Sequence, residues 1–465
     1  MRLTFYGGAR SVTGANYLLE TSDKKQATRI LIDCGLHQGS NYCEKHNFEP
    51  FPYKPEEISA AFITHAHIDH IGRLPQLYRA GFRGTIYSTG PTKDFAELLL
   101  LDSESILRKE SEKHRKPILY EAKDVNETMK LWQKRTYHEK IKVSGFSAQG
   151  GPASGWEVEF YDAGHILGSS SILVSGESKK IVFSGDLGNT PAPLIKSTEY
   201  LKEADYALVE STYGNRIHER KKERKDELED LIEETVKAGG TLMIPSFALE
   251  RTQELLAELN ELVEGDRIPR VPIFIDSPLA IKLTSVYQKY SRDPAYFNRR
   301  AIKTIEGGDA IFNFPGLKMS LTSAESKEIN DVPPPKVIVA GAGMSNGGRI
   351  LHHERRYLSD PKNAILFIGY QANGSLGRQI LDGAKSVRIF GEEIPVKCRI
   401  KAIGGYSAHA DQPLLIDWIK TMQPRLKKVF VVQGEDDESL PFAQKIKDEL
   451  ALEAEVPEAG TGVVL

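Results

Sequence analysis

The pattern of hydrophobic and polar positions changes at about residue 210. Before that point, short apolar runs bounded by Gly, Asp and Ser recur, and such runs predict the buried strands of sheets. These runs cover residues 3–6, 17–20, 30–32, 60–64, 158–161, 170–174 and 181–184. The intervening stretches 92–113 and 121–134 are charged and rich in helix formers, so we expect helices that cover the outside of the sheets.

After residue 210 the pattern alternates between helix and strand. An amphipathic helix with Leu228, Leu231 and Val236 on one face ends before two glycines. The strands predicted next cover residues 242–244, 272–275, 337–340 and 365–368, with a helix over 253–263. Strands alternating with helices predict a parallel sheet. From about residue 398, a further strand, helix and strand indicate a compact closing unit.

Length and charge set limits on the function. A chain of 465 residues exceeds what one hydrophobic core usually serves, so we expect two domains. With 61 basic and 64 acidic side chains the net charge is −3, which excludes a basic surface over the whole chain. A nucleic-acid substrate stays compatible with this balance, because an enzyme needs only a local positive groove.

Cysteine content and hydropathy predict the compartment. The cysteines Cys34, Cys43 and Cys398 are too few and too scattered for a disulfide framework, and no CxxC spacing predicts a thiolate zinc site. The N-terminal sequence MRLTFYGGAR has no apolar core of signal-peptide length, and nowhere do about 18 apolar residues follow one another. We therefore expect a cytoplasmic protein with no membrane partner.

The strongest chemical signal is the sequence THAHIDH at residues 64–70, directly after an apolar run. Side chains two positions apart on an extended segment point the same way, so His65 and His67 can bind one metal ion. The following turn can direct Asp69 and His70 toward a second ion. Imidazole and carboxylate ligands without a thiolate suit a catalytic zinc pair. The alternative, solvated surface histidines, does not explain the clustering at a strand end.

Two later residues can complete such a site. His165 ends the sequence DAGH and Asp186 ends the sequence SGD, and each follows a predicted strand. Either residue alone is more often a turn or capping residue. Together with the first cluster, they supply a third imidazole and a carboxylate able to bridge two ions.

The HxHxDH sequence resembles the signature of the metallo-β-lactamase superfamily, and Asp33-Cys34-Gly35 resembles its first motif, whose Asp orients a metal ligand by hydrogen bonding. The resemblance implies an αββα sandwich with two bound zinc ions. The ligands that it implies are His65, His67, His165 and Asp186 at one ion, and Asp69, His70 and Asp186 at the other.

The second half of the chain resembles the β-CASP nucleases, which include bacterial and archaeal homologues of the mRNA 3′-end processing endonuclease. Residues 210–216 (ESTYGNR) look like motif A and residues 406–411 (YSAHAD) like motif B. This resemblance implies an α/β, Rossmann-like β-CASP domain over residues 210–397. That domain would be inserted into a metallo-β-lactamase domain formed by residues 1–209 and 398–465, with the active site between the two.

The implied function is a zinc-dependent ribonuclease that cleaves single-stranded RNA. We expect endonucleolytic cleavage, with 5′ to 3′ exonucleolytic trimming as a further mode. A metal-bound hydroxide would attack phosphorus and His409 would protonate the leaving oxygen, with Glu210 orienting its imidazole and Asp69 completing the catalytic residues.

The side chains in the inserted domain that could hold substrate phosphates are Ser246, Arg251, Ser345 and Arg349. Serine hydroxyls and guanidinium groups in loops after strands can bind phosphate. Ordinary salt bridges and caps explain these four residues equally well. The resemblance is also compatible with a homodimer.

The sequence departs from the family at motif C, where the corresponding run VVQGE has Gln433 in place of a histidine. A neutral amide oxygen is a poorer zinc ligand than imidazole. We therefore expect the second zinc ion to bind weakly or not at all, or manganese to replace it, with Gln433 a doubtful ligand. Two alternatives follow: a metal-impaired RNA-binding scaffold that pairs with an active paralogue, and a hydrolase of DNA or small phosphodiesters.

Overall fold

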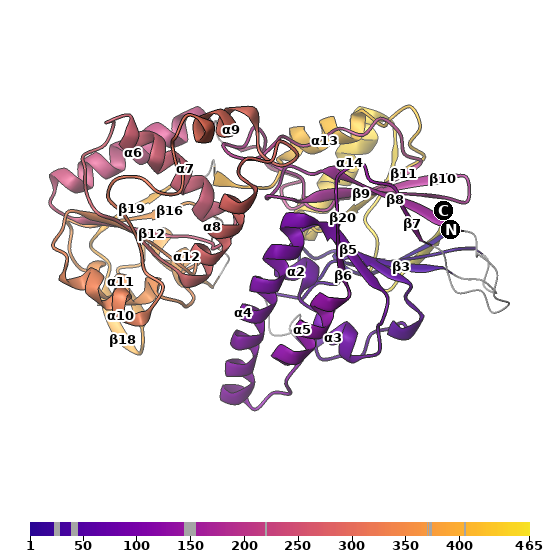
Figure 1. The fold of residues 1–465 in the computed structure, drawn as a ribbon, viewed down its shortest axis with the longest axis horizontal. Helices are drawn as coiled ribbons and strands as arrows, with labels where there is room; N and C mark the ends of the chain where they lie inside the picture. The colour runs from indigo at the N-terminus through magenta and orange to yellow at the C-terminus, as the bar shows by residue number, and fades with distance from the viewer. Residues whose placement is uncertain are drawn as a thin grey trace. The chain divides into compact units, whose positions relative to one another are not determined.

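The computed structural model describes residues 1–22, 28–38, 45–143, 155–218, 221–369, 371, 374–403 and 406–465, so Cys43 lies outside the described residues. The chain forms two compact units (Figure 1). The first comprises residues 1–191, 196–217 and 409–465, and the second comprises residues 192–195 and 218–408. No helix among the described residues is long and apolar enough to cross a membrane.

Seven described strands form the first sheet of the first unit. In spatial order they are β22 (Gly462–Val464), β1 (Arg2–Gly7), β2 (Asn16–Glu20), β3 (Arg29–Ile32), β4 (Ala60–Phe62), β5 (Thr85–Thr89) and β6 (Trp132–Arg135). The hairpin strands β1 to β3 pair antiparallel, and β3 to β6 pair parallel. Because β22 pairs with β1, the two chain ends lie side by side.

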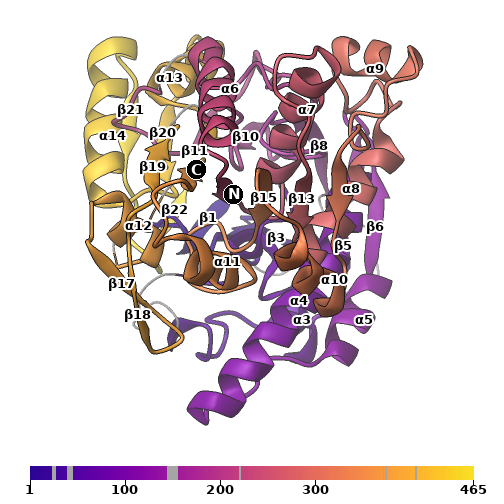
Figure 2. The ribbon, with the colours of Figure 1, turned by 90° about the vertical axis from the view of Figure 1, so that its left-hand side faces the viewer.

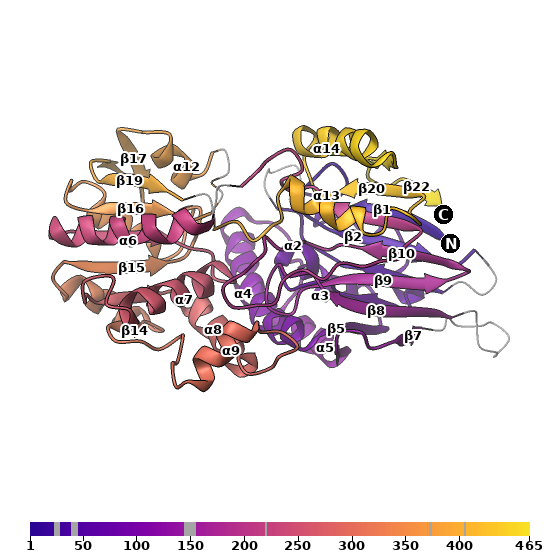
Figure 3. The same ribbon diagram turned by 90° about the horizontal axis from the view of Figure 1, so that it is seen from above.

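The second sheet combines strands from distant parts of the chain. Its order is β21 (Glu453–Glu455), β20 (Lys428–Val432), β11 (Tyr206–Glu210), β10 (Lys179–Phe183), β9 (Ser170–Gly176), β8 (Trp156–Asp162) and β7 (Ile141–Val143). Figure 3 shows β10, β9 and β8 side by side. The C-terminal strand β20 runs parallel to β11, and β11 runs parallel to β10, so their carboxyl ends meet at one edge.

The two sheets enclose one apolar core, to which Phe5, Phe62, Phe160, Phe183 and Phe430 contribute. Helices cover both outer faces (Figure 1). They are α2 (Ile68–Ile71), α3 (Leu74–Arg79), α4 (Gly90–His114) and α5 (Ala122–Lys130) on one side, and α13 (Gln412–Lys420) and α14 (Asp436–Leu450) on the other, with the short helix η1 (Pro55–Glu57) also in this unit. This arrangement confirms the predicted αββα sandwich.

The second unit is built on a parallel sheet of six described strands, as the alternating pattern predicts. Its order is β14 (Leu317–Met319), β13 (Ile273–Asp276), β15 (Lys336–Ala340), β12 (Thr241–Pro245), β16 (Ala364–Phe367) and β19 (Arg399–Ala402). Helices lie on both faces (Figure 2). They are α6 (Lys221–Lys237), α7 (Arg251–Glu264), α8 (Pro278–Tyr290), α9 (Arg299–Glu306), α10 (Ser323–Glu328), η2 (Ile329–Asp331), α11 (Ile350–Tyr357) and α12 (Leu376–Leu381), beside the hairpin β17 (Ser386–Ile389) and β18 (Glu392–Pro395).

Three predicted boundaries differ from the structure. The helix predicted over residues 121–134 ends at Lys130, because residues 132–135 pair with β5 as strand β6. Residues 398–408, predicted to open the closing part of the metallo-β-lactamase domain, lie in the second unit, because β19 pairs with β16. Residues 210–217, predicted to open the inserted domain, lie in the first unit directly after β11.

Candidate metal and catalytic site

Six of the predicted site residues of the first unit lie at or just after the carboxyl ends of strands. His65 and His67 follow β4, His165 follows β8, Asp186 follows β10, Glu210 ends β11 and Gln433 follows β20. Two sharp turns depend on glycine: Gly164 and Gly185 have φ of 65° and 58°. A Cβ at Gly164 would lie 2.4 Å from the backbone nitrogen of Thr198, so no larger residue fits. These turns direct the next histidine and aspartate toward the site.

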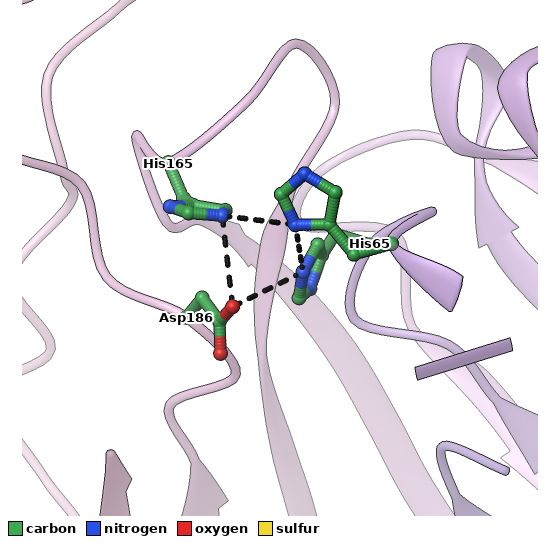
Figure 4. Close-up of side chains that lie close together, drawn as sticks. His65, His165 and Asp186 are labelled. Carbon is green, nitrogen blue, oxygen red and sulfur yellow. Dashed lines mark hydrogen bonds and ion pairs between the residues drawn. The ribbon is translucent and has the colours of Figure 1, made fainter. Parts of the chain in front are cut away.

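His65, His67, His165 and Asp186 form a compact group whose ligand atoms all lie within 4.8 Å of one another. Nε2 of His65 lies 3.0 Å from Nδ1 of His67 and 3.3 Å from Oδ2 of Asp186. Nε2 of His165 lies 3.2 Å from Nδ1 of His67 and 3.6 Å from Oδ2 of Asp186. Figure 4 shows His65, His165 and Asp186 pointing toward one another. Four ligands about 2.1 Å from a zinc ion in a tetrahedron lie about 3.4 Å apart, so this group fits one such ion.

The protonation of these imidazoles also suits a cation. Burial lowers the pKa of both His67 and His165 well below the usual range of histidine, and neighbouring imidazoles shift the pKa in the same direction. Both rings are therefore neutral near neutral pH, and a neutral ring nitrogen offers its lone pair to a metal ion.

The predicted ligands of a second ion are less compact. Nε2 of His70 lies 3.4 Å from Oδ1 of Asp186 and 3.8 Å from Oδ2 of Asp69. Among the described residues, the groups of three or more His, Cys, Asp or Glu ligand atoms within 4.8 Å include Asp186, but neither Asp69 nor His70. The buried Gln433 side chain lies between these groups, with Nε2 2.7 Å from Oδ1 of Asp186 and 3.0 Å from Nε2 of His70.

Asp33 fixes the orientation of His70. Its Oδ2 accepts the Nδ1 hydrogen of His70 at 2.7 Å, and its carboxylate also accepts the backbone N–H and the hydroxyl of Thr64, at 2.8 and 2.7 Å. The Thr64 hydroxyl lies 3.0 Å from Nδ1 of His65 as well. Thr64 was not among the predicted site residues, although its place directly before the HxHxDH sequence was a usable signal.

Glu210 and His409 form a second pair in the same unit. Nδ1 of His409 lies 3.1 Å from Oε2 of Glu210, which is fully buried, and 3.9 Å from Oδ2 of Asp186. Oε1 of Glu210 accepts the backbone N–H of Leu187 at 2.6 Å. The backbone of His409 forms an antiparallel bridge with Gly188. A buried carboxylate beside Nδ1 can hold a protonated imidazole and leave Nε2 to exchange a proton.

The four predicted phosphate-binding residues lie in the second unit, and each has partners inside the protein. The guanidinium of Arg349 donates to Oδ1 of Asp276 and to the carbonyl of Ser320, both at 2.8 Å. The Ser345 hydroxyl donates to Glu354, and NH1 of Arg251 lies 3.5 Å from Glu254.

Ser246 is 2% exposed, and its hydroxyl lies 3.0 Å from that of Thr252. All four contacts match the alternative interpretation, ordinary salt bridges and internal hydrogen bonds.

Three protein-family profiles match successive parts of the chain. The metallo-beta-lactamase superfamily matches residues 14–207, the Beta-Casp domain residues 252–380, and the Zn-dependent metallo-hydrolase RNA specificity domain residues 393–457. "Ribonuclease TTHA0252" of Thermus thermophilus is 37% identical over 444 residues, which cover 96% of this chain and 95% of that relative. The chain belongs to the β-CASP branch of the metallo-β-lactamase superfamily. This β-CASP protein is therefore a metal-dependent hydrolase of nucleic acid, and the resemblance found in the sequence is confirmed.

Other relatives of this β-CASP protein come from archaea. "Transcription termination factor FttA" of Methanosarcina mazei is 31% identical over 469 residues, which cover 97% of this chain and 70% of FttA. "RNase J-like protein" of Methanocaldococcus jannaschii is 31% identical over 462 residues, which cover 99% and 98% of the two chains. A crystal structure of a protein of unknown function from Enterococcus faecalis has a TM-score of 0.55 and 13% identity, with 100% of this chain and 99% of that chain covered. That similarity concerns the fold alone.

Proposed function

We propose that this β-CASP protein is a zinc-dependent ribonuclease that hydrolyses phosphodiester bonds of single-stranded RNA. The observation that carries the proposal is that Asp186 lies within 4.8 Å both of the ligand atoms of His65, His67 and His165 and of those of the Glu210–His409 pair. Relatives named as ribonucleases and the profile of an RNA specificity domain support RNA as the substrate. The main mode is endonucleolytic cleavage that leaves a 3′-hydroxyl and a 5′-phosphate, with 5′ to 3′ trimming as a second mode.

The residues that would hold the metal ion are His65, His67, His165 and Asp186. When bound, a zinc ion supplies Lewis acidity toward a phosphoryl oxygen. His65, His165 and Asp186 are buried and His67 is half-buried, and their ligand atoms all lie within 4.8 Å of one another. The protein therefore holds its ligands in place before the ion binds, which lowers the free-energy cost of assembling the site.

His409 is the residue that we assign to protonate the leaving oxygen. Glu210 holds Nδ1 of the imidazole, so the ring keeps one orientation and its charged form is stabilised. Nε2 then carries the transferable proton. The backbone N–H of Leu187 donates in turn to Oε1 of Glu210, which helps to hold the carboxylate in place. Positioned proton transfer of this kind contributes about 10² to 10⁴ in rate.

The proposal is tested with purified protein, zinc and a labelled single-stranded RNA. His409→Ala should lower kcat by about 10² to 10⁴ and leave bound zinc unchanged. His67→Ala should abolish both cleavage and zinc binding, because it removes a ligand of the compact group. The matched control is His138→Ala, since His138 is an exposed histidine of the same unit, and this variant should behave like the wild type.

The same assay separates the alternative functions. The replacement of a histidine ligand by Gln433 favours the metal-impaired scaffold, and this alternative predicts RNA binding without cleavage by the zinc-loaded protein. Competition among RNA, single-stranded DNA and a chromogenic phosphodiester tests the third function. Preference for DNA or for the small ester would contradict the ribonuclease proposal.

A further inference from the structure

Gln433 is held in an uncommon backbone conformation directly after β20. Its φ is 51°, in the left-handed region that non-glycine residues seldom adopt. Its backbone N–H donates to the carbonyl of Gly8 at 2.6 Å, and its carbonyl accepts the Thr212 hydroxyl at 3.2 Å. A Cβ at Gly8 would lie 3.3 Å from Cγ of Gln433, so the side chain packs closely against this glycine. These contacts direct the carboxamide to one place, and the residue is 2% exposed.

The two N–H groups of this carboxamide have two acceptors. Nε2 of Gln433 lies 2.7 Å from Oδ1 of Asp186 and 3.0 Å from Nε2 of His70. Nδ1 of His70 gives its hydrogen to Asp33, and an amide nitrogen can only donate, so Nε2 of His70 is the acceptor in its 3.0 Å contact with Gln433. Exchanging the amide oxygen and nitrogen would place an oxygen 2.7 Å from a carboxylate oxygen, which is repulsive. The hydrogen-bonding partners therefore determine the amide orientation.

Asp186 divides its two oxygens between two sets of partners. Oδ2 faces His65 and His165 of the compact group, at 3.3 and 3.6 Å. Oδ1 faces Gln433 and His70. A second metal ion would need the lone pairs on Oδ1 of Asp186 and Nε2 of His70, and these are the two atoms that accept from Gln433. Its entry would break two buried hydrogen bonds, and the neutral amide oxygen would be a weak replacement ligand.

We propose that the chain binds one metal ion, at His65, His67, His165 and Asp186, and that the Gln433 carboxamide takes the place of a second ion by joining His70 to Asp186 through its two N–H groups. The inference rests on the metal site of the proposed function. Gln433 is thus a positioning residue: it holds the bridging carboxylate and the imidazole where a cation would otherwise hold them.

Metal stoichiometry tests the inference without an activity assay. The wild type and three variants are saturated with Zn²⁺, freed of loose metal and analysed by elemental analysis and native mass spectrometry. The wild type should hold about one zinc ion per chain, whereas Gln433→His and Gln433→Glu, which supply an imidazole or a carboxylate ligand, should hold about two. The matched control is Tyr17→Phe: the buried Tyr17 hydroxyl lines the same pocket as Gln433 and has no hydrogen-bond partner among the described residues. This variant should hold about one ion, like the wild type.

Each other result overturns the inference. About two ions in the wild type would mean that Gln433 does not exclude the second metal ion. That result would leave the ribonuclease proposal intact. If circular dichroism shows that both Gln433 variants are folded and neither binds more metal than the wild type, the Gln433 amide does not take the place of a second ion. No metal in the wild type would contradict the compact site and the proposed function together. If both variants fail to fold, ¹¹³Cd NMR of the cadmium-loaded wild type decides: one resonance is expected, and two would overturn the inference.

Discussion

At the scale of the residue, two buried acids show that hydrogen-bond partners decide what a carboxyl group does. Asp33 accepts three hydrogen bonds, from Thr64 and His70, and thereby orients a residue of the site. Within the described part of the chain, Glu354 accepts only the Ser345 hydroxyl, and its other oxygen is buried without a partner. Burial raises the pKa of Glu354 to about 8, although the hydrogen bond from Ser345 opposes the shift. Glu354 is therefore protonated at neutral pH and anchors the Ser345 loop as a neutral acid.

Replacing Glu354 by Gln tests this protonation state. Between about pH 4.5 and pH 8 the folded chain keeps a proton that the unfolded chain releases, so this residue makes the free energy of unfolding fall as pH rises. Glu354→Gln removes that contribution. Its free energy of unfolding relative to the wild type should rise by about 1 kcal/mol or more between about pH 6 and about pH 9, measured by urea unfolding.

The matched control for this experiment is the exposed Glu328, which carries the same chemical group on α10. Glu328→Gln should show no such pH-dependent difference. If the free energies of unfolding of the wild type and Glu354→Gln differ by the same amount at both pH values, Glu354 is not protonated in the folded protein.

At the scale of the element, helix α13 positions His409. The helix begins one residue after Asp411, whose side chain accepts the backbone N–H of Leu414. Its inner face buries Leu415, Trp418 and Ile419 in the apolar cluster that covers the second sheet. The segment before the helix therefore has little freedom, and His409 lies next to Glu210 because the packed helix holds the residues that precede it.

Removing the helix cap should disturb both stability and the site. Asp411→Ala leaves an unsatisfied backbone N–H at the start of α13 and should cost about 1 kcal/mol in the free energy of unfolding. It should also lower kcat for RNA cleavage more than it changes KM, since the imidazole loses its fixed position. Asp411→Ser retains a capping oxygen and should restore most of both properties. If the Ala and Ser variants lower kcat equally, the helix cap does not control the position of His409.

At the scale of the whole molecule, the chain builds each unit from segments far apart in sequence. The first unit takes its second sheet from both ends of the chain, since β20 pairs with β11 across the residues of the second unit. The compact group of His65, His67, His165 and Asp186 in turn brings together residues from three loops of this unit. A metal ion at this group links these loops, so it should stabilise the folded first unit against unfolding.

Removal of the metal should therefore lower the thermal stability of the protein. With free zinc at about 100 times its Kd, binding adds about 2.7 kcal/mol to the free energy of unfolding, which a chelator abolishes. Differential scanning calorimetry of the zinc-loaded protein with and without 1,10-phenanthroline should show a lower Tm for the chelated sample. His67→Ala should show no shift, because it lacks the site. A wild-type Tm that is insensitive to the chelator would contradict a metal site in the folded first unit.

The sequence by itself determined the fold class and which histidines and aspartate form the compact group, because both depend on the local order of residues. Strand and helix periodicity is visible over a few residues. His65, His67 and His165 can likewise be located in the sequence, because each comes soon after a predicted strand. By contrast, the helix predicted over residues 121–134 was too long, because the pairing of β6 with β5 is not a local property.

Only the tertiary structure decided which partner each polar side chain has. The sequence left Arg349 open between phosphate binding and an internal salt bridge, and the fold places it against Asp276, which lies 73 residues away. Likewise, the sequence showed that Gln433 replaces a histidine, but not that its amide donates toward His70 and Asp186. Hydrogen bonds join groups that are close in space, so their partners become defined only when distant segments pack together.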